Sequence, residues 1–125
     1  MKILLVDDSI VIRTHLRAMA DTIRTAEVVG EADNATRGIE LMRKLKPDVM
    51  VLDISLLGSN GVDVLIESRN LDVHPTVAIM TNHPYDAYRR ICTRLGADYF
   101  FDKSKDFYRL GDVLRNIVER RITTQ

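Results

Sequence analysis

The sequence has little of what several classes of protein require. Its 125 residues include a single cysteine, Cys92, so no internal disulfide can form, and a reducing compartment such as the cytoplasm is expected. No apolar run approaches the roughly 18 residues of a membrane-spanning helix. The 18 Lys and Arg residues balance 18 Asp and Glu residues, which predicts no general attraction to nucleic acid or to an anionic membrane.

Two kinds of ligand site are also missing from the sequence. The three histidines are scattered and lack the spacing of a zinc site. No glycine-rich loop follows the first apolar run, where Asp7 and Asp8 stand instead and would repel a phosphate. This argues against a flavin-binding or nucleotide-binding module.

Five short apolar runs are present, beginning near residues 3, 28, 49, 76 and 98, and segments with helical periodicity lie between them. Nearly continuous apolar strands that alternate with amphipathic helices are typical of a parallel sheet covered on both faces. The sequence therefore predicts a single α/β domain of five strand–helix units. The fourth helix is expected to open with Pro84 and to bury four apolar side chains: Tyr88, Ile91, Cys92 and Leu95.

Polar residues follow four of the apolar runs directly: Asp7 with Asp8, then Asp53, Thr81 and Lys103. The carboxyl ends of parallel strands meet at one edge of a sheet, where open α/β proteins bind their ligands. Each of these residues has an ordinary explanation when taken alone, such as a helix cap or a surface charge. Their shared position at the ends of four strands is specific, and it predicts a site.

The residue types at this edge indicate a particular chemistry. Three carboxylates within a few ångströms repel one another by roughly 3–4 kcal/mol per pair at an effective dielectric constant near 20, so a cation is expected among them. Hard divalent ions such as Mg²⁺ prefer oxygen ligands. Aspartate is a known covalent acceptor of phosphoryl groups, and the transfer needs in-line positioning and neutralised oxygen charge. We therefore predict that Asp53 accepts a phosphoryl group, assisted by Lys103 and the Thr81 hydroxyl.

These segments resemble the receiver domain of bacterial two-component response regulators, in particular stand-alone receivers of the chemotaxis type. The resemblance rests on Ile3–Ser9, Asp53 with Gly61, Thr81, and Gly96–Lys103. It covers essentially the whole chain, so residues 1–125 are expected to form one receiver domain. It implies a flavodoxin-like, doubly wound (βα)₅ fold with strand order 2-1-3-4-5.

Carried over by position, the resemblance implies a phosphoryl acceptor and a metal site. Asp53 would be the acceptor, and Lys103 would pair with it and then with the phosphoryl group. Asp7, Asp8 and Asp53, with the backbone carbonyl of Ser55, would hold Mg²⁺ or Mn²⁺.

The resemblance also implies a switch. Thr81 would donate its hydroxyl to the phosphoryl group, and Phe100 takes the aromatic switch position, where its ring is expected to turn inward on phosphorylation. Ser55, Asn82 and His83 would flank the phosphoryl group and help to set its rate of hydrolysis.

Three departures from the family pattern affect this site. Many relatives have proline where this chain has Leu57 and Ser104. The peptide bond before the second proline is often cis in the family, and a cis bond before serine costs roughly 2.5–4 kcal/mol more than trans, so the loop after Lys103 is expected to differ. Asn82 is bulkier than the small residue usual at its position and is expected to restrict access to the pocket.

The function that follows is a signalling switch rather than a metabolic enzyme. A histidine kinase or a histidine phosphotransfer protein would donate the phosphoryl group. A downstream protein, not nucleic acid or membrane, would bind the face made by the fourth helix, fifth strand and fifth helix.

Three alternatives remain open. The chain can be the receiver portion of a longer regulator, or a receiver that works without phosphorylation. It can also be an aspartate-nucleophile phosphatase of the haloacid dehalogenase type, although Ser55 stands where that family has its second aspartate.

Overall fold

Strands and helices alternate strictly along the chain, as its periodicity predicts. The computed structural model describes residues 1–56 and 60–123, with the side chains of the last helix described as far as Arg121. Leu57 lies outside the described residues. In chain order the elements are β1 (Lys2–Val6), α1 (Ile10–Asp21), β2 (Glu27–Ala32), α2 (Ala35–Leu45), β3 (Val49–Leu52), α3 (Gly61–Ser68), β4 (Thr76–Thr81), α4 (Asp86–Arg94), β5 (Tyr99–Asp102) and α5 (Phe107–Thr123).

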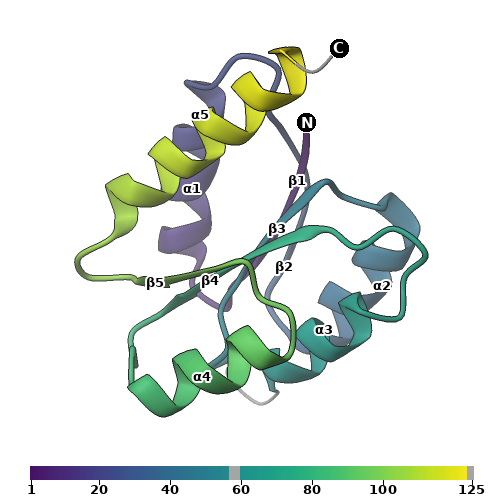
Figure 1. The fold of residues 1–125 in the computed structure, drawn as a ribbon, viewed down its shortest axis with the longest axis vertical. Helices are drawn as coiled ribbons and strands as arrows, with labels where there is room; N and C mark the ends of the chain where they lie inside the picture. Colours follow the sequence, from purple (N-terminus) through teal and green to yellow (C-terminus); the bar gives the residue numbers. More distant parts are fainter. Residues whose placement is uncertain (57–59, 124–125) are drawn as a thin grey trace.

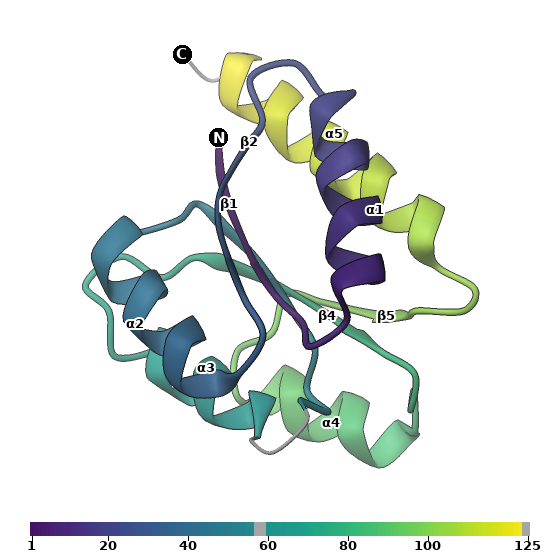
Figure 2. The ribbon, with the colours of Figure 1, turned by 180° about the vertical axis from the view of Figure 1, so that it is seen from behind.

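The five strands form one parallel sheet in the order β2-β1-β3-β4-β5, which confirms the flavodoxin-like topology. Helices α1 and α5 cover one face of the sheet, and α2, α3 and α4 cover the other (Figures 1 and 2). The chain reverses its direction of winding between β1 and β3, and a crevice opens outside the carboxyl ends of the strands at such a point. Asp7 and Asp53 directly follow these two strands.

Two apolar cores lie on either side of the sheet, because successive side chains of a strand point to opposite faces. On β1, Leu4 and Val6 belong to the core beneath α2, α3 and α4. Ile3 and Leu5 belong to the core beneath α1 and α5. All four side chains are at most 1% exposed, which explains why the strand is apolar throughout instead of alternating with polar residues.

Short polar side chains begin three of the helices. Ser9 caps α1 as predicted, its Oγ accepting a hydrogen bond from the Ile12 amide at 3.3 Å. Asn34 and Asn60 cap α2 and α3 in the same way. These caps satisfy backbone N–H groups that have no partner inside the helix, and so they set where each helix begins.

The prediction for α4 was wrong in two respects. The helix begins at Asp86, so Pro84 precedes it instead of opening it. Of the four side chains expected to be buried, only Cys92 is: Tyr88 is 41% exposed, Ile91 is 49% exposed, and Leu95 is half-buried. Because α4 packs mainly against β5, the edge strand, less sheet lies beneath it than its apolar stripe would cover.

Gly61 allows the start of α3 to lie directly against the backbone of the site. Its amide donates to the Ile54 carbonyl at 3.3 Å. A Cβ atom at this position would overlap the Asp53 carbonyl oxygen and would lie 2.6 Å from the Ile54 Cα. Neither backbone atom can move without displacing the segment that carries Asp53.

We therefore expect Gly61→Ala to lower the free energy of unfolding by about 1–3 kcal/mol or more, since the overlap is with backbone. Gly111→Ala is the matched control, because a Cβ there would meet the flexible ends of Arg115 and Met19 at 3.2 and 3.3 Å. It also gains helix propensity. Denaturant unfolding measures both variants, and equal stabilities would contradict the expectation.

Candidate functional site

The backbone ladder of the sheet continues one residue beyond three of its strands and places the predicted site residues. The Asp7 amide donates to the Ala32 carbonyl, the Asp53 amide to the Val6 carbonyl, and the Lys103 amide to the Thr81 carbonyl, each at 2.9 Å. These residues therefore have the rigidity of the sheet and not that of a loop. Their side chains emerge together at its carboxyl edge.

Three carboxyl groups gather at this edge. Asp7, Asp8 and Asp53 each offer an oxygen within 4.8 Å of the other two. Asp7 and Asp53 are buried, and Asp8 is exposed. A set of hard, negatively charged oxygens open to solvent on one side suits Mg²⁺, which takes one or two carboxylates and keeps several waters.

One ammonium group is shared by the two buried carboxylates. Lys103 Nζ lies 2.7 Å from Asp7 Oδ2 and 2.9 Å from Asp53 Oδ2, and all three side chains are 4–6% exposed. Burial opposes the charge of Lys103, but the hydrogen bonds and charges of Asp7 and Asp53 outweigh it and raise the pKa of the lysine. Lys103 therefore stays protonated and joins the two strand ends.

The pKa of the Asp7 carboxyl group is raised in the same arrangement. Burial raises the pKa of the Asp7 carboxyl group, and the negative charge of Asp53 adds to this effect, while Lys103 and the Ser9 amide lower it. The net direction is upward because the effect of burial outweighs the hydrogen bonds from Lys103 and the Ser9 amide. A cation bound beside Asp7 would favour the charged form of this carboxyl group.

A hollow of about 420 Å³ opens onto this cluster. Asp53 is fixed at its base, since its Oδ1 accepts a hydrogen bond from the Ser55 amide at 2.9 Å. Thr81 is fully buried and does not line the hollow, although its hydroxyl accepts a hydrogen bond from the His83 amide at 3.0 Å. The lining residues are Asp8, Ser9, Ile12, Asp53, Ser55, Asn82, His83 and Lys103.

Asn82 and His83 are both exposed in the wall of the hollow. Asn82 is thus beside the pocket, where it was expected to narrow the entrance. His83 also stacks on Tyr85, with ring centroids 6.0 Å apart. The residues predicted to flank the phosphoryl group therefore lie together, with Ser55 on the opposite loop.

The Phe100 ring already points inward in this structure, before any phosphorylation. It is 9% exposed and belongs to the core beneath α2, α3 and α4. The guanidinium carbon of Arg89 lies 4.7 Å from the ring centroid. Any effect of phosphorylation on this ring must therefore begin from a conformation in which the ring is already inside.

The loop after Lys103 has its own polar framework, which was not predicted. Asp102 Oδ1 accepts hydrogen bonds from the amide and the hydroxyl of Ser104 at 2.8 and 2.7 Å. Asp106 Oδ2 accepts one from the Asp102 amide at 3.0 Å. Every peptide bond in the described part of the chain is trans. The spacing Asp-x-Ser, typical of a side-chain-capped turn, was the available signal.

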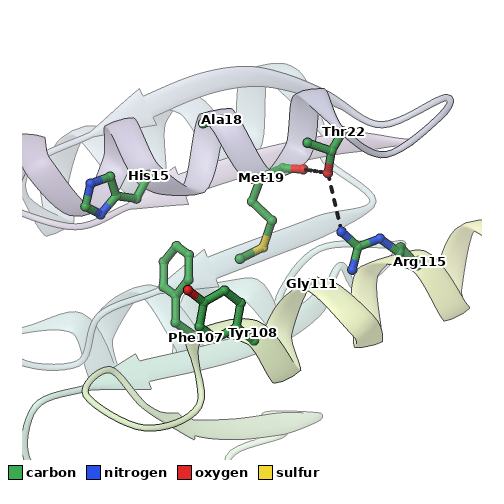
Figure 3. Close-up of a pocket in the computed structure, with 8 residues that line it drawn as sticks. All are labelled: His15, Ala18, Met19, Thr22, Phe107, Tyr108, Gly111 and Arg115. Atoms are coloured by element: carbon green, nitrogen blue, oxygen red, sulfur yellow. Dashed lines mark hydrogen bonds between the residues drawn. The ribbon is translucent and has the colours of Figure 1, made fainter.

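A second hollow lies between α1 and α5, away from the predicted site (Figure 3). It measures about 510 Å³ and is lined mainly by apolar groups, among them Met19, Phe107 and Gly111. His15 stands at one end, and Arg115 reaches the Thr22 hydroxyl at 3.4 Å at the other. None of the described residues that line it is acidic, in contrast to the hollow beside Asp53.

Comparisons with known proteins agree with this geometry. The model of the response regulator receiver domain matches residues 3–115. The nitrate/nitrite response regulator NarL of Escherichia coli is 33% identical over 106 residues, covering 83% of this chain and 48% of NarL. A protein-glutamate methylesterase/protein-glutamine glutaminase of Vibrio vulnificus is 40% identical over 103 residues, covering 80% of this chain and 30% of that protein.

Among solved structures, a LuxR-family two-component response regulator from Aurantimonas is similar with a TM-score of 0.85 and 29% identity. The match covers 94% of this chain and 84% of that one. The chain spans about half or less of the length of the two curated relatives above.

The chain belongs to the response regulator receiver domain family. Receiver domains are in general phosphorylation-controlled signalling switches that bind Mg²⁺ at an acidic pocket, and the Asp7, Asp8 and Asp53 cluster can hold such an ion. No helix in the described part of the chain has the length and apolar character needed to cross a membrane.

The loop after Lys103 gives a test by pH. Hydrogen bonds from Ser104 hold the pKa of Asp102 below its ordinary value of 3.8. The stability that this group adds is therefore present above pH 3.8 and is lost as the pH falls through the lower, folded-state value. We expect Ser104→Ala to raise the pKa of Asp102 towards 3.8 in a carboxyl NMR titration.

Asp106 is an internal control in the same spectra. The Asp102 amide lowers the pKa of Asp106, and Ser104 plays no part in this. An unchanged Asp102 titration, or an equal rise at both residues, would contradict the assignment of the hydrogen bonds.

Proposed function

We propose that residues 1–125 form a receiver domain whose Asp53 accepts a phosphoryl group from the phosphohistidine of a histidine kinase or histidine phosphotransfer protein. The observation that carries the proposal is the Lys103 ammonium held between Asp7 and Asp53 at the base of an open, acidic hollow. Phosphoryl transfer requires positioning and charge neutralisation more than covalent chemistry from the protein. This cluster supplies both.

In the proposed step, a carboxylate oxygen of Asp53 forms a bond to phosphorus as the phosphorus–nitrogen bond of the donor breaks. The electron pair of the broken bond returns to the imidazole. Lys103 already contacts Asp53 and is placed to follow the negative charge onto the phosphoryl oxygens. Attack by water later restores the Asp53 carboxylate and releases phosphate, at a rate influenced by Ser55, Asn82 and His83.

Asp7, Asp8 and Asp53 would hold Mg²⁺, or Mn²⁺ in its place, with the backbone carbonyl of Ser55 as a further ligand. When bound, the ion supplies positive charge for the phosphoryl oxygens. The donor set fits, because the three oxygens are hard ligands that lie within 4.8 Å of one another.

The output surface is proposed to be the face of α4, β5 and α5. Four large side chains that are apolar or aromatic are exposed on α4, α5 and the residue before α4: Tyr85, Tyr88, Ile91 and Tyr108. Aromatic residues of this kind are enriched in protein interfaces. With balanced charge overall, this surface suits a protein partner better than nucleic acid or a membrane, and the reduced, buried Cys92 suits a cytoplasmic setting.

Phosphorylated Asp53 would carry extra negative charge and additional acceptor oxygens. The Thr81 hydroxyl is the proposed donor to those oxygens, because Thr81 ends β4 at the same sheet edge and its hydroxyl accepts a hydrogen bond from the His83 amide. Movement of Thr81 and the segment after it would alter the packing between α4 and the buried Phe100 ring. The switch would then be a shift in population between two packings of this face.

The first test of the proposal is covalent labelling. Incubation with acetyl phosphate and Mg²⁺ is expected to add one phosphoryl mass to the intact protein, and removal of the metal with a chelator should prevent it. Asp53→Asn should abolish the addition. Asp63→Asn is the matched control, because it makes the same change at an exposed carboxylate on α3 that does not line the hollow. Full labelling of Asp53→Asn would refute the acceptor.

The second test separates transfer from signalling. Thr81→Ala is expected to retain phosphorylation but to lose most of the phosphorylation-dependent change in amide hydrogen exchange in α4 and β5. Thr81→Ser keeps the hydroxyl and should behave as the wild type. Equal exchange changes in both variants would show that the hydroxyl of Thr81 does not couple the site to that face.

A further inference from the structure

Arg13, on the first turns of α1, reaches back over the end of β1. Its Nη1 donates a hydrogen bond to the backbone carbonyl of Asp7 at 2.5 Å, and its Nε donates to Glu31 Oε1 at 3.1 Å. The Arg13 side chain is only 13% exposed. A planar guanidinium suits this task, because it donates in two fixed directions at once.

This contact completes the restraint of Asp7. The Asp7 amide donates to the Ala32 carbonyl, Oδ1 accepts from the Ser9 amide at 2.9 Å, and Oδ2 meets Lys103. The carbonyl held by Arg13 belongs to the peptide group that joins Asp7 to Asp8. The orientation of this peptide group therefore determines the direction in which the Asp8 side chain points, and so whether the Asp7 and Asp8 carboxylates converge.

Glu31 in turn holds Arg13. It lies on β2, at the edge of the sheet, and also pairs with Arg17. The hydrogen bond from Arg17 is the main reason that the pKa of Glu31 is lowered, with Arg13 contributing as well. Glu31 therefore remains charged and anchors the guanidinium.

We propose that Arg13, anchored by Glu31, is a positioning residue for the cation site. This inference rests on the proposed function, in that it assigns a role towards the Mg²⁺ that Asp7, Asp8 and Asp53 would bind. Among the hydrogen bonds of the described residues, the Arg13 side chain contacts the Asp7 backbone carbonyl and Glu31. It acts through the Asp7 carbonyl.

A positioning role and a purely electrostatic role of Arg13 predict opposite changes in Mg²⁺ affinity when the residue is replaced. Arg13→Met removes a positive charge near the site, which by charge alone would make Mg²⁺ bind more tightly. If Arg13 orients the Asp7–Asp8 peptide, the same change weakens binding, by about tenfold or more, as is usual when an outer partner of a metal ligand is lost. Titration of metal-free protein with Mg²⁺ distinguishes the two.

Arg17→Met is the matched control. It removes a cation that pairs with the same Glu31, but Arg17 makes no contact with Asp7 among the hydrogen bonds of the described residues. Its Mg²⁺ affinity should equal or slightly exceed that of the wild type. Arg13→Lys keeps the positive charge but cannot donate hydrogen bonds in two fixed directions at once, so it should also bind Mg²⁺ more weakly than the wild type. Because this change is milder, it provides the same test if Arg13→Met does not fold.

Glu31 should act only through Arg13. Glu31→Ala is expected to weaken Mg²⁺ binding, and the double variant Arg13→Met/Glu31→Ala should bind no more weakly than Arg13→Met alone. Additive losses would overturn the anchoring role of Glu31.

A second readout needs no metal. In metal-free protein, Arg13→Met should shift the carbonyl ¹³C resonance of Asp7 and speed hydrogen exchange of the Asp8 amide, whereas Arg17→Met should leave both unchanged. If wild-type protein binds Mg²⁺ but Arg13→Met binds it equally or more tightly, the positioning role is wrong and the proposed function stands. If wild-type protein binds no Mg²⁺, the proposed cation site fails and this role fails with it.

Discussion

One buried ammonium group holds the functional edge of this protein together. Lys103 lies between Asp7 and Asp53, and all three side chains are almost completely removed from solvent. Burying a carboxylate without a partner would be strongly unfavourable, and Lys103 gives both aspartates a partner of opposite charge. The three residues come from the ends of β1, β3 and β5, and their pairing therefore spans the centre and one edge of the sheet.

One ammonium group does not balance the formal charge of the three carboxylates at this edge. Three carboxylates stand against one ammonium, so the cluster has a formal excess of two negative charges. A divalent cation matches this excess, and a phosphoryl group brings charge that the cation and the lysine can share. The proposed roles of the cation and of the phosphoryl group both rest on this balance of charge.

The surroundings of the cluster differ sharply in how firmly they are held. Asp53 is fixed by the backbone ladder, by the Ser55 amide and by the close approach of Gly61. On the other side, α4 buries little more than Cys92 and leaves Tyr88 and Ile91 in solvent. Elements that bury few apolar contacts are the ones that open and move at low cost in free energy. A firmly held Asp53 beside a helix with few buried side chains suits the proposed switch, in which the site stays in place while the surface changes.

The sequence by itself determined the architecture and which polar residues meet at the carboxyl edge of the sheet. Apolar runs and helical periodicity identified every strand and helix, because burial on both faces of a parallel sheet imposes a pattern that is local along the chain. The resemblance to receiver domains then supplied the strand order. Asp7, Asp8, Asp53 and Lys103 could be placed together in advance, since each lies within two residues of the end of a strand and parallel strands end at one edge.

Only the tertiary structure decided the features that depend on which distant segments pack against a residue. The apolar stripe of α4 correctly indicated a helix, but the narrow sheet edge beneath it left Tyr88 and Ile91 exposed. The resemblance implied a switch position for Phe100, but the buried state of its ring follows from packing with distant segments. The reach of Arg13 to the Asp7 carbonyl and to Glu31 on another strand has no periodic signature, because such contacts are set by the fold and not by spacing in the chain.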